Sequence, residues 1–153
     1  ANVRVSAGDI YEISNIKINV YDAQHGDTPS SMYMVETSDG TTVFHTGDNQ
    51  TFLNYPSINP DIFLVNSWME YYDSSLDIVD ISDRPAARRH AVRTAVDVLQ
   101  SKVTLLGHIH EFYYEWVDDT STRVIYETHL DTDIESPSGE IYMLTWGESI
   151  SYP

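Results

Sequence analysis

The sequence of 153 residues contains no cysteine. This absence excludes disulfide bonds, thiolate nucleophiles and zinc sites with cysteine ligands. Any metal ion must therefore be held by His, Asp or Glu side chains. The chain has 6 His and 24 Asp and Glu residues, so donors for such a site are present.

Basic residues are also scarce. Lysine occurs only at Lys17 and Lys102, and the formal net charge is −16. A surface with this charge repels phosphate backbones, so a nucleic-acid partner is not expected. A bound divalent cation would reverse the field locally.

Long apolar runs are missing too. No stretch reaches the roughly 18 apolar residues of a membrane span, so no membrane partner is expected. The segment Ala1–Arg4 lacks the charged-then-apolar pattern of a signal peptide, and the prediction is a soluble, cytoplasmic protein. The length and a hydrophobic content of 41% fit a single domain over residues 1–153 with its own core.

Apolar residues recur in several segments of strand length. Predicted strands are residues 11–13, 16–21, 32–37, 43–46, 61–66, 102–107, 112–117, 122–128 and 140–146. The segment 61–66 contains a continuous apolar run, Ile62–Val65, which favours a strand buried on both faces, and 102–107 is predicted as another buried strand. Ser38–Gly40 predicts a hairpin turn. The polar stretch Gln24–Ser31 predicts a loop, with the preceding strand ending near Asp22.

One clear helix is predicted over residues 85–100. Asp83 can cap it, and Pro85 suits its first turn. Its apolar residues recur at helical period, and its first half carries Arg84, Arg88, Arg89 and Arg93. This arginine cluster would meet an anionic substrate or pair with the chain's own acids. Together the elements predict an α/β fold of the α+β sandwich type.

The strand 43–46 is followed by Gly47 and Asp48. A carboxylate at a strand tip, beside a glycine that permits close approach, suits a metal ion or an oriented water. The alternative is an ordinary Gly-Asp turn. His25, at the start of the predicted polar loop, is either a second ligand or a solvated histidine.

A third candidate follows the buried strand 102–107, where His108 and His110 stand two residues apart. Residues at that spacing share a face of a strand, so both imidazoles could enter one site. With Glu111 or Asp48 they could hold a mononuclear metal; alternatively His110 is exposed. The remaining histidines are interpreted as structural or surface residues: His45, His90 and His129.

Five stretches carry a family resemblance: "GDIYEISNIKINVYDAQH", "TTVFHTGD", "DIFLVN", "KVTLLGH" and "IYMLTWGE". In this order they resemble the C-terminal half of a metallo-β-lactamase-fold hydrolase. The similarity is to the lactonase branch, which includes the L-ascorbate-6-phosphate lactonases. The resemblance implies the β-rich half of an αββα sandwich with one helix near residues 85–100.

The same resemblance implies a site with one or two divalent metals, usually zinc and sometimes manganese or iron. His25 matches the third histidine of the first metal site, Asp48 the catalytic carboxylate that bridges both metals, and His108 the last histidine on the second metal. His110 is a further candidate ligand. In this family, metal-bound hydroxide attacks an ester, lactone, amide or phosphoester of a small-molecule substrate.

One departure from the family is clear, since the His-x-His-x-Asp-His motif of its first half is absent. The chain is then a proteolytic or engineered fragment, a half that pairs with a separate chain, or a standalone relic. An open apolar sheet face is expected to need a partner, either the missing N-terminal half or a second copy. The alternative function is a non-catalytic binding or oligomerisation module, incomplete for catalysis.

Overall fold

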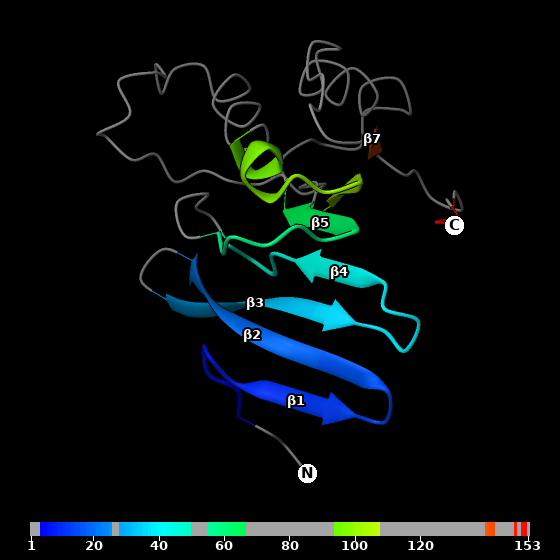
Figure 1. Ribbon diagram of the computed structural model, residues 1–153. Helices are drawn as coiled ribbons and strands as arrows, with labels where there is room; N and C mark the ends of the chain where they lie inside the picture. Colours follow the sequence, from blue (N-terminus) through cyan, green and yellow to red (C-terminus); the bar gives the residue numbers. More distant parts are fainter. Residues whose placement is uncertain are drawn as a thin grey trace, which may run out of the picture.

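The computed structural model describes residues 4–25, 28–49, 55–66, 94–107, 140–142, 149 and 151–152, and within them seven strands form one mixed sheet (Figure 1). The strands follow one another across the sheet in chain order. They are β1 (Ile10–Ile13), β2 (Ile16–His25), β3 (Thr28–Glu36), β4 (Thr42–His45), β5 (Ile62–Asn66), β6 (Val103–Gly107) and β7 (Glu140–Tyr142). Strands β1 to β4 pair antiparallel, and β4 to β7 pair parallel.

Tight turns connect β1 to β2 and β3 to β4. The turn between β1 and β2 places Ser14 at a φ of 57°, a left-handed conformation that suits a two-residue hairpin loop. Between β3 and β4, the Gly40 amide donates to the Thr37 carbonyl at 2.9 Å, so the predicted hairpin at Ser38–Gly40 is confirmed. The exposed Asp39 carboxylate accepts from Thr37 Oγ1 and the Thr41 amide, and these bonds hold its pKa below the usual value.

The loop predicted over Gln24–Ser31 is wrong in part. Strand β2 continues to His25, and β3 begins at Thr28, so the two strands pair along nine residues. The first pair of this extension is Ala23 with Ser30. Small and polar side chains hide the two-residue periodicity, while the paired backbone still satisfies its hydrogen bonds. His25 is therefore the last residue of a strand.

The core lies on one face of the sheet, around Phe44. Its ring stacks with Phe63 at 6.0 Å between centroids and meets the edges of Tyr21 and Tyr55 at 5.9 and 6.2 Å. Residues 94–99 are helical and cover this face (Figure 1). Their buried side chains are Ala95, Val96 and Leu99. This segment confirms the later part of the predicted helix, and residues 85–93 with the arginine cluster lie outside the described residues.

The opposite face carries aligned apolar side chains. Residues paired across neighbouring strands point to the same side of a sheet. The registers align one row over five strands: Ile18, Val35, Val43, Ile62 and Val103. All five are half-buried. Because β5 buries Phe63 and Val65 fully but leaves Ile62 and Leu64 half-buried, burial on both of its faces is only partly realised.

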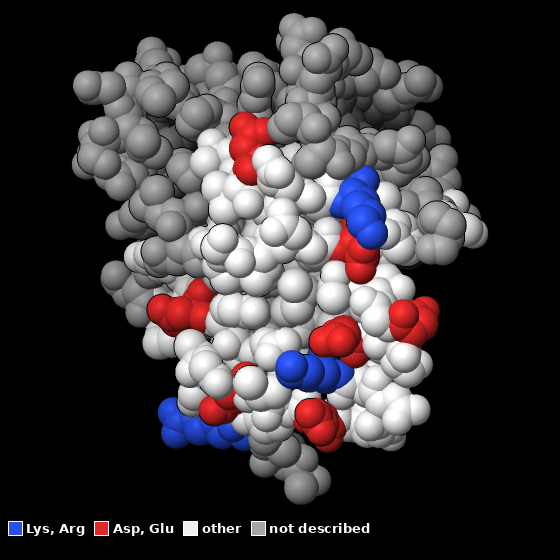
Figure 2. All heavy atoms as spheres, in the orientation of Figure 1, with Lys and Arg blue, Asp and Glu red and all other residues white. Residues whose placement is uncertain are grey.

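Charge on the described surface is dispersed. Figure 2 shows basic side chains that are separated from one another and lie next to acidic ones. This view therefore contains no continuous basic patch within the described residues. Among those same residues, no helix has the length and apolar character needed to cross a membrane.

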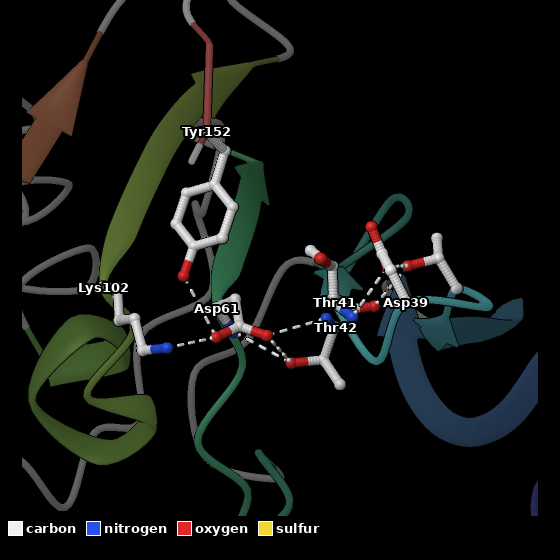
Figure 3. Close-up of polar contacts among 7 residues, drawn as sticks. Asp39, Thr41, Thr42, Asp61, Lys102 and Tyr152 are labelled. Atoms are coloured by element: carbon white, nitrogen blue, oxygen red, sulfur yellow. Dashed lines mark hydrogen bonds and ion pairs between the residues drawn. The ribbon is translucent and has the colours of Figure 1, made fainter.

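A polar cluster around Asp61 lies where β4, β5 and β6 begin (Figure 3). Asp61 Oδ2 accepts from the Thr42 amide and hydroxyl, both at 2.8 Å. Asp61 Oδ1 accepts from Lys102 Nζ at 2.6 Å and from the Tyr152 hydroxyl at 3.1 Å. These donors, Lys102 first, hold the Asp61 pKa far below its usual value. The cluster joins the start of three strands to Tyr152 near the chain end.

Candidate metal centre

One edge of the sheet collects the ends of the strands that carry the candidate ligands. Strands β2 and β4 run in the same direction because each is antiparallel to β3, and β5 and β6 are parallel to β4. Their last residues, including His25, His45 and Gly107, therefore lie toward the same edge. His108 is the next residue after Gly107 in the sequence and lies outside the described residues.

The β2–β3 hairpin extends past the end of β4. Val20 aligns with Tyr33, and Tyr33 with His45, so β2 continues five residues beyond the level at which β4 ends. The chain after β4 turns against this extension. The Thr46 amide donates to the Leu64 carbonyl at 3.1 Å, and the Asn49 amide donates to the Thr46 carbonyl at 3.2 Å.

Gly47 allows this turn for two reasons. Its φ is 57°, in the left-handed region where side chains are disfavoured. A Cβ at this position would lie 2.5 Å from the Ser31 carbonyl oxygen on β3. Only a residue without a side chain fits so close to β3, and the next residue, Asp48, is carried toward the end of β2.

The turn brings two of the predicted ligands together. His25 Nε2 lies 3.2 Å from Asp48 Oδ2, although His25 ends β2 and Asp48 lies in the turn after β4. The two side chains are 40% and 50% exposed, so solvent and small molecules can reach the pair. That His25, Asp48 and His108 together form one metal site stays a prediction.

The spacing of the pair fits a shared metal ion. Two N or O ligands of a tetrahedral zinc, each at 2.0–2.2 Å, stand about 3.4 Å apart. The separation of 3.2 Å is close to this value and also allows a direct His–Asp ion pair. Among the described residues, no three His, Asp or Glu side chains gather into a cation site. Further donors must come from elsewhere; His108, His110 and Glu111 lie outside the described part.

His45, interpreted from the sequence as structural, stabilises the turn. Its Nδ1 accepts the Gly47 amide proton at 2.7 Å, which requires that nitrogen to be unprotonated. Partial desolvation also lowers the pKa of His45, although much of the ring is exposed. His45 aligns with Tyr33 and Leu64 on the sheet face away from the Phe44 core.

Asn49 is a site residue that the sequence did not predict. This side chain is fully buried, and its Oδ1 accepts the Gln24 amide proton at 2.9 Å. The available signal was its position directly after Gly-Asp at a strand tip, where Asn often bonds to nearby backbone. Its long-range partner on β2 could not be inferred while Gln24 was assigned to a loop.

Three solved structures are similar to this chain over nearly its whole length. The metallo-β-lactamase fold protein YhfI from Bacillus subtilis has 15% identity, a TM-score of 0.57, and a match covering 95% of this chain and 54% of that one. Igni18, a metallo hydrolase from the archaeon Ignicoccus hospitalis, has 12% identity, a TM-score of 0.58 and coverage of 99% and 60%. CmlA, a diiron β-hydroxylase from Streptomyces venezuelae, has 13% identity, a TM-score of 0.51 and coverage of 93% and 33%.

No protein-family model matches the sequence, and no curated protein matches it. The structural similarity shows that this chain has a metallo-β-lactamase fold, so the predicted mixed α/β fold is confirmed. The chain spans between a third and three fifths of the length of these structures.

Proposed function

We propose that this chain is part of a metal-dependent hydrolase of the lactonase-like kind, with His25 and Asp48 among its metal ligands. The observation that carries the proposal is the 3.2 Å approach of the His25 and Asp48 side chains at the end of β2 and the turn after β4. The metallo-β-lactamase fold supports it, because metal-dependent hydrolases occur among its members. The reaction is hydrolysis of an ester, lactone, amide or phosphoester of a small molecule.

The residues of this chain bind and orient. His25 offers its Nε2 atom as a ligand, and Asp48 offers a carboxylate oxygen. Gly47 lets the turn that carries Asp48 lie close to β3, where a Cβ would meet the Ser31 carbonyl oxygen. Bound here, a divalent cation would lower the pKa of a coordinated water and polarise the scissile group.

His108, with His110 as a further candidate, completes the proposed ligand set. Gly107 ends β6 toward the same edge as His25, and His108 follows it directly. Imidazole and carboxylate donors accept zinc, manganese or iron, and zinc is the proposed ion.

The proposal includes a partner for the apolar sheet face. The row from Ile18 to Val103 is half-buried and crosses five strands. We propose that the second sheet of the sandwich packs on this row, and that the segment missing relative to the longer similar structures supplies it together with further ligands. Self-association through the same face is the competing outcome.

Zinc binding tests the ligand proposal. Isothermal titration of the chain with Zn²⁺, alone and with the complementary half, should show saturable binding. Asp48→Ala and His25→Ala should each weaken it more than about 100-fold, since even residues outside the ligand shell typically contribute 10–100-fold. The matched control is Asp22→Ala, which removes an exposed carboxylate from the same strand as His25.

Hydrolysis by the chain together with the complementary half is measured on a panel of lactones, carboxylic esters and phosphoesters. The rate should fall in the variants that lose zinc affinity. Unchanged metal content and unchanged turnover in Asp48→Ala would contradict the hydrolase proposal.

The second candidate is a non-catalytic binding or oligomerisation module. It is favoured by the aligned apolar row and by the lack of a three-donor cluster among the described residues. A module of this kind would associate stably while binding zinc no more tightly than the Asp48→Ala variant does. The convergence of His25 and Asp48 weighs against it.

A further inference from the structure

Asn49 is a buried polar residue between the two segments that carry the candidate ligands. It follows Asp48 directly, and its side chain contacts Gln24, the residue that precedes His25. Its exposed fraction is 0%, whereas the side chains of His25 and Asp48 are 40% and 50% exposed. A buried amide beneath an exposed pair suits a supporting role.

The contacts of Asn49 use both ends of its carboxamide. Oδ1 accepts the backbone proton of Gln24 at 2.9 Å, and Nδ2 lies 3.6 Å from Met32 Sδ. The side chain also hydrogen-bonds the Tyr55 hydroxyl, whose pKa burial raises and this bond lowers. The backbone amide of Asn49 donates to the Thr46 carbonyl and closes the turn. Asn49 is thereby fixed to β2, to the core and to its own turn.

We propose that Asn49 is a positioning residue that holds the Asp48 turn against β2, so that Asp48 meets His25 at ligand spacing. The role follows from connectivity, because one hydrogen bond joins the neighbour of His25 to the neighbour of Asp48. The proposal rests on the proposed metal site for its functional meaning. The placement of Asp48 beside His25 can be measured without metal.

The position calls for an amide. The Gln24 N–H donates to Asn49 Oδ1 in a part-buried bond, and a hydrogen bond of this kind contributes about 0.5–1.5 kcal/mol. The same side chain must also donate toward Met32 and Tyr55. Leucine has a similar shape and supplies neither function, and aspartate supplies the acceptor alone.

The first test is free of metal. In the wild-type chain, nuclear Overhauser contacts between the His25 ring protons and the Asp48 β protons should report the 3.2 Å approach. Asn49→Leu should lose these contacts, and Asn49→Asp should keep them because Gln24 retains its acceptor. Met32→Leu is the matched control, since it alters the same buried surroundings and leaves the Asn49–Gln24 bond intact.

The second test is Zn²⁺ affinity by titration calorimetry. Asn49→Leu should weaken Zn²⁺ binding about 10–100-fold, as other supporting residues of metal sites do. Met32→Leu should stay within about twofold of wild type even where its melting temperature falls. In an Asp48→Asn background, Asn49→Leu should have little further effect, because it acts through the carboxylate that is already lost.

The results separate the two proposals. A wild-type chain that shows the His25–Asp48 contacts and binds no Zn²⁺ contradicts the proposed function, while the contact measurement still decides the role of Asn49. Contacts that survive in Asn49→Leu overturn the positioning role. If Asn49→Leu fails to fold, Asn49→Ser replaces it in both tests, because the serine side chain is too short for its hydroxyl to reach the Gln24 amide.

Discussion

At the scale of single residues, the site depends on the absence of a side chain at Gly47. The backbone at Gly47 is left-handed, and the Ser31 carbonyl occupies the place where a side chain would begin. These two constraints are separable, because Gly40 is also left-handed, with a φ of 87°, and has open space around it. A pair of alanine substitutions can therefore assign a cost to each constraint.

Gly47→Ala should destabilise the protein by about 3 kcal/mol, because it combines left-handed strain with a steric clash against β3. Gly40→Ala should cost about 1 kcal/mol from strain alone. The measurement is the midpoint and slope of urea unfolding for both variants. Equal losses at the two positions would show that the Ser31 carbonyl moves away easily.

At the scale of elements, Asp61 joins the beginnings of three strands. Its carboxylate accepts hydrogen bonds from Thr42, the first residue of β4, and from Lys102, which directly precedes β6. Its backbone carbonyl accepts from the Val103 amide at 3.0 Å. The carboxylate side chain is 18% exposed, so water competes little for these bonds. Removal of its charge should loosen β4, β5 and β6 together.

Stability should fall in acid through Asp61. Its folded-state pKa lies below the unfolded value of about 3.9, so its contribution is fully present above that value and is lost as the pH falls toward the folded pKa. Asp61→Asn should cost about 2 kcal/mol at pH 7. The cost should shrink below about pH 4, where Asp61 of the unfolded wild-type chain begins to protonate.

Urea unfolding between pH 7 and pH 3 measures this difference. Asp22→Asn, at an exposed position of β2, is the control and should leave the pH dependence nearly unchanged. A constant gap between Asp61→Asn and wild type over the whole range would refute the assignment.

The elements that could be predicted are those in which large apolar side chains stand out from polar flanking residues. The strands around Phe44, Phe63 and Thr104 were predicted within one or two residues, because large side chains mark them. The end of β2 was missed, because Ala23 and its partner Ser30 give no hydrophobic signal even though Ala23 is buried. Its pairing comes from the backbone and from the neighbouring strand, which a local pattern does not contain.

The candidate site was predictable only as a list of donors. His25 and Asp48 stood out as polar residues near strand ends, and the structure brings them together. Asn49 could not be found, since its role depends on a partner 25 positions away in the sequence. Whether His108 joins the pair stays a prediction.

At the scale of the whole molecule, the two sheet faces differ. One packs Phe44 and Phe63 under the helical residues 94–99, and the other presents the half-buried row through Val43. The alternation of side chains along each strand produces both faces from the same segments. The row through Val43 is the surface on which we propose that the second sheet packs.

Val43→Glu should abolish association with the complementary half, or self-association, because it puts a charge at the centre of the apolar row. Sedimentation velocity with and without the complementary half measures this. Val98→Glu is the control, as Val98 is 46% exposed on the helical segment. Wild-type and Val43→Glu chains with the same association state would contradict a second sheet on this face.

The switch from antiparallel to parallel pairing at β4 also predicts the order in which the strands fold. Strands β1 to β4 are joined by short local reversals, whereas β5 and β6 pair across the intervening residues 67–102. Closing a long loop costs more entropy than closing a short one, so the local meander should nucleate first and serve as a template for the parallel strands. Pulse-labelled amide exchange during refolding should protect Val35 before Leu105. The His25–Asp48 pair joins β2 to the turn that follows β4. It would then be among the earliest long-range contacts to form.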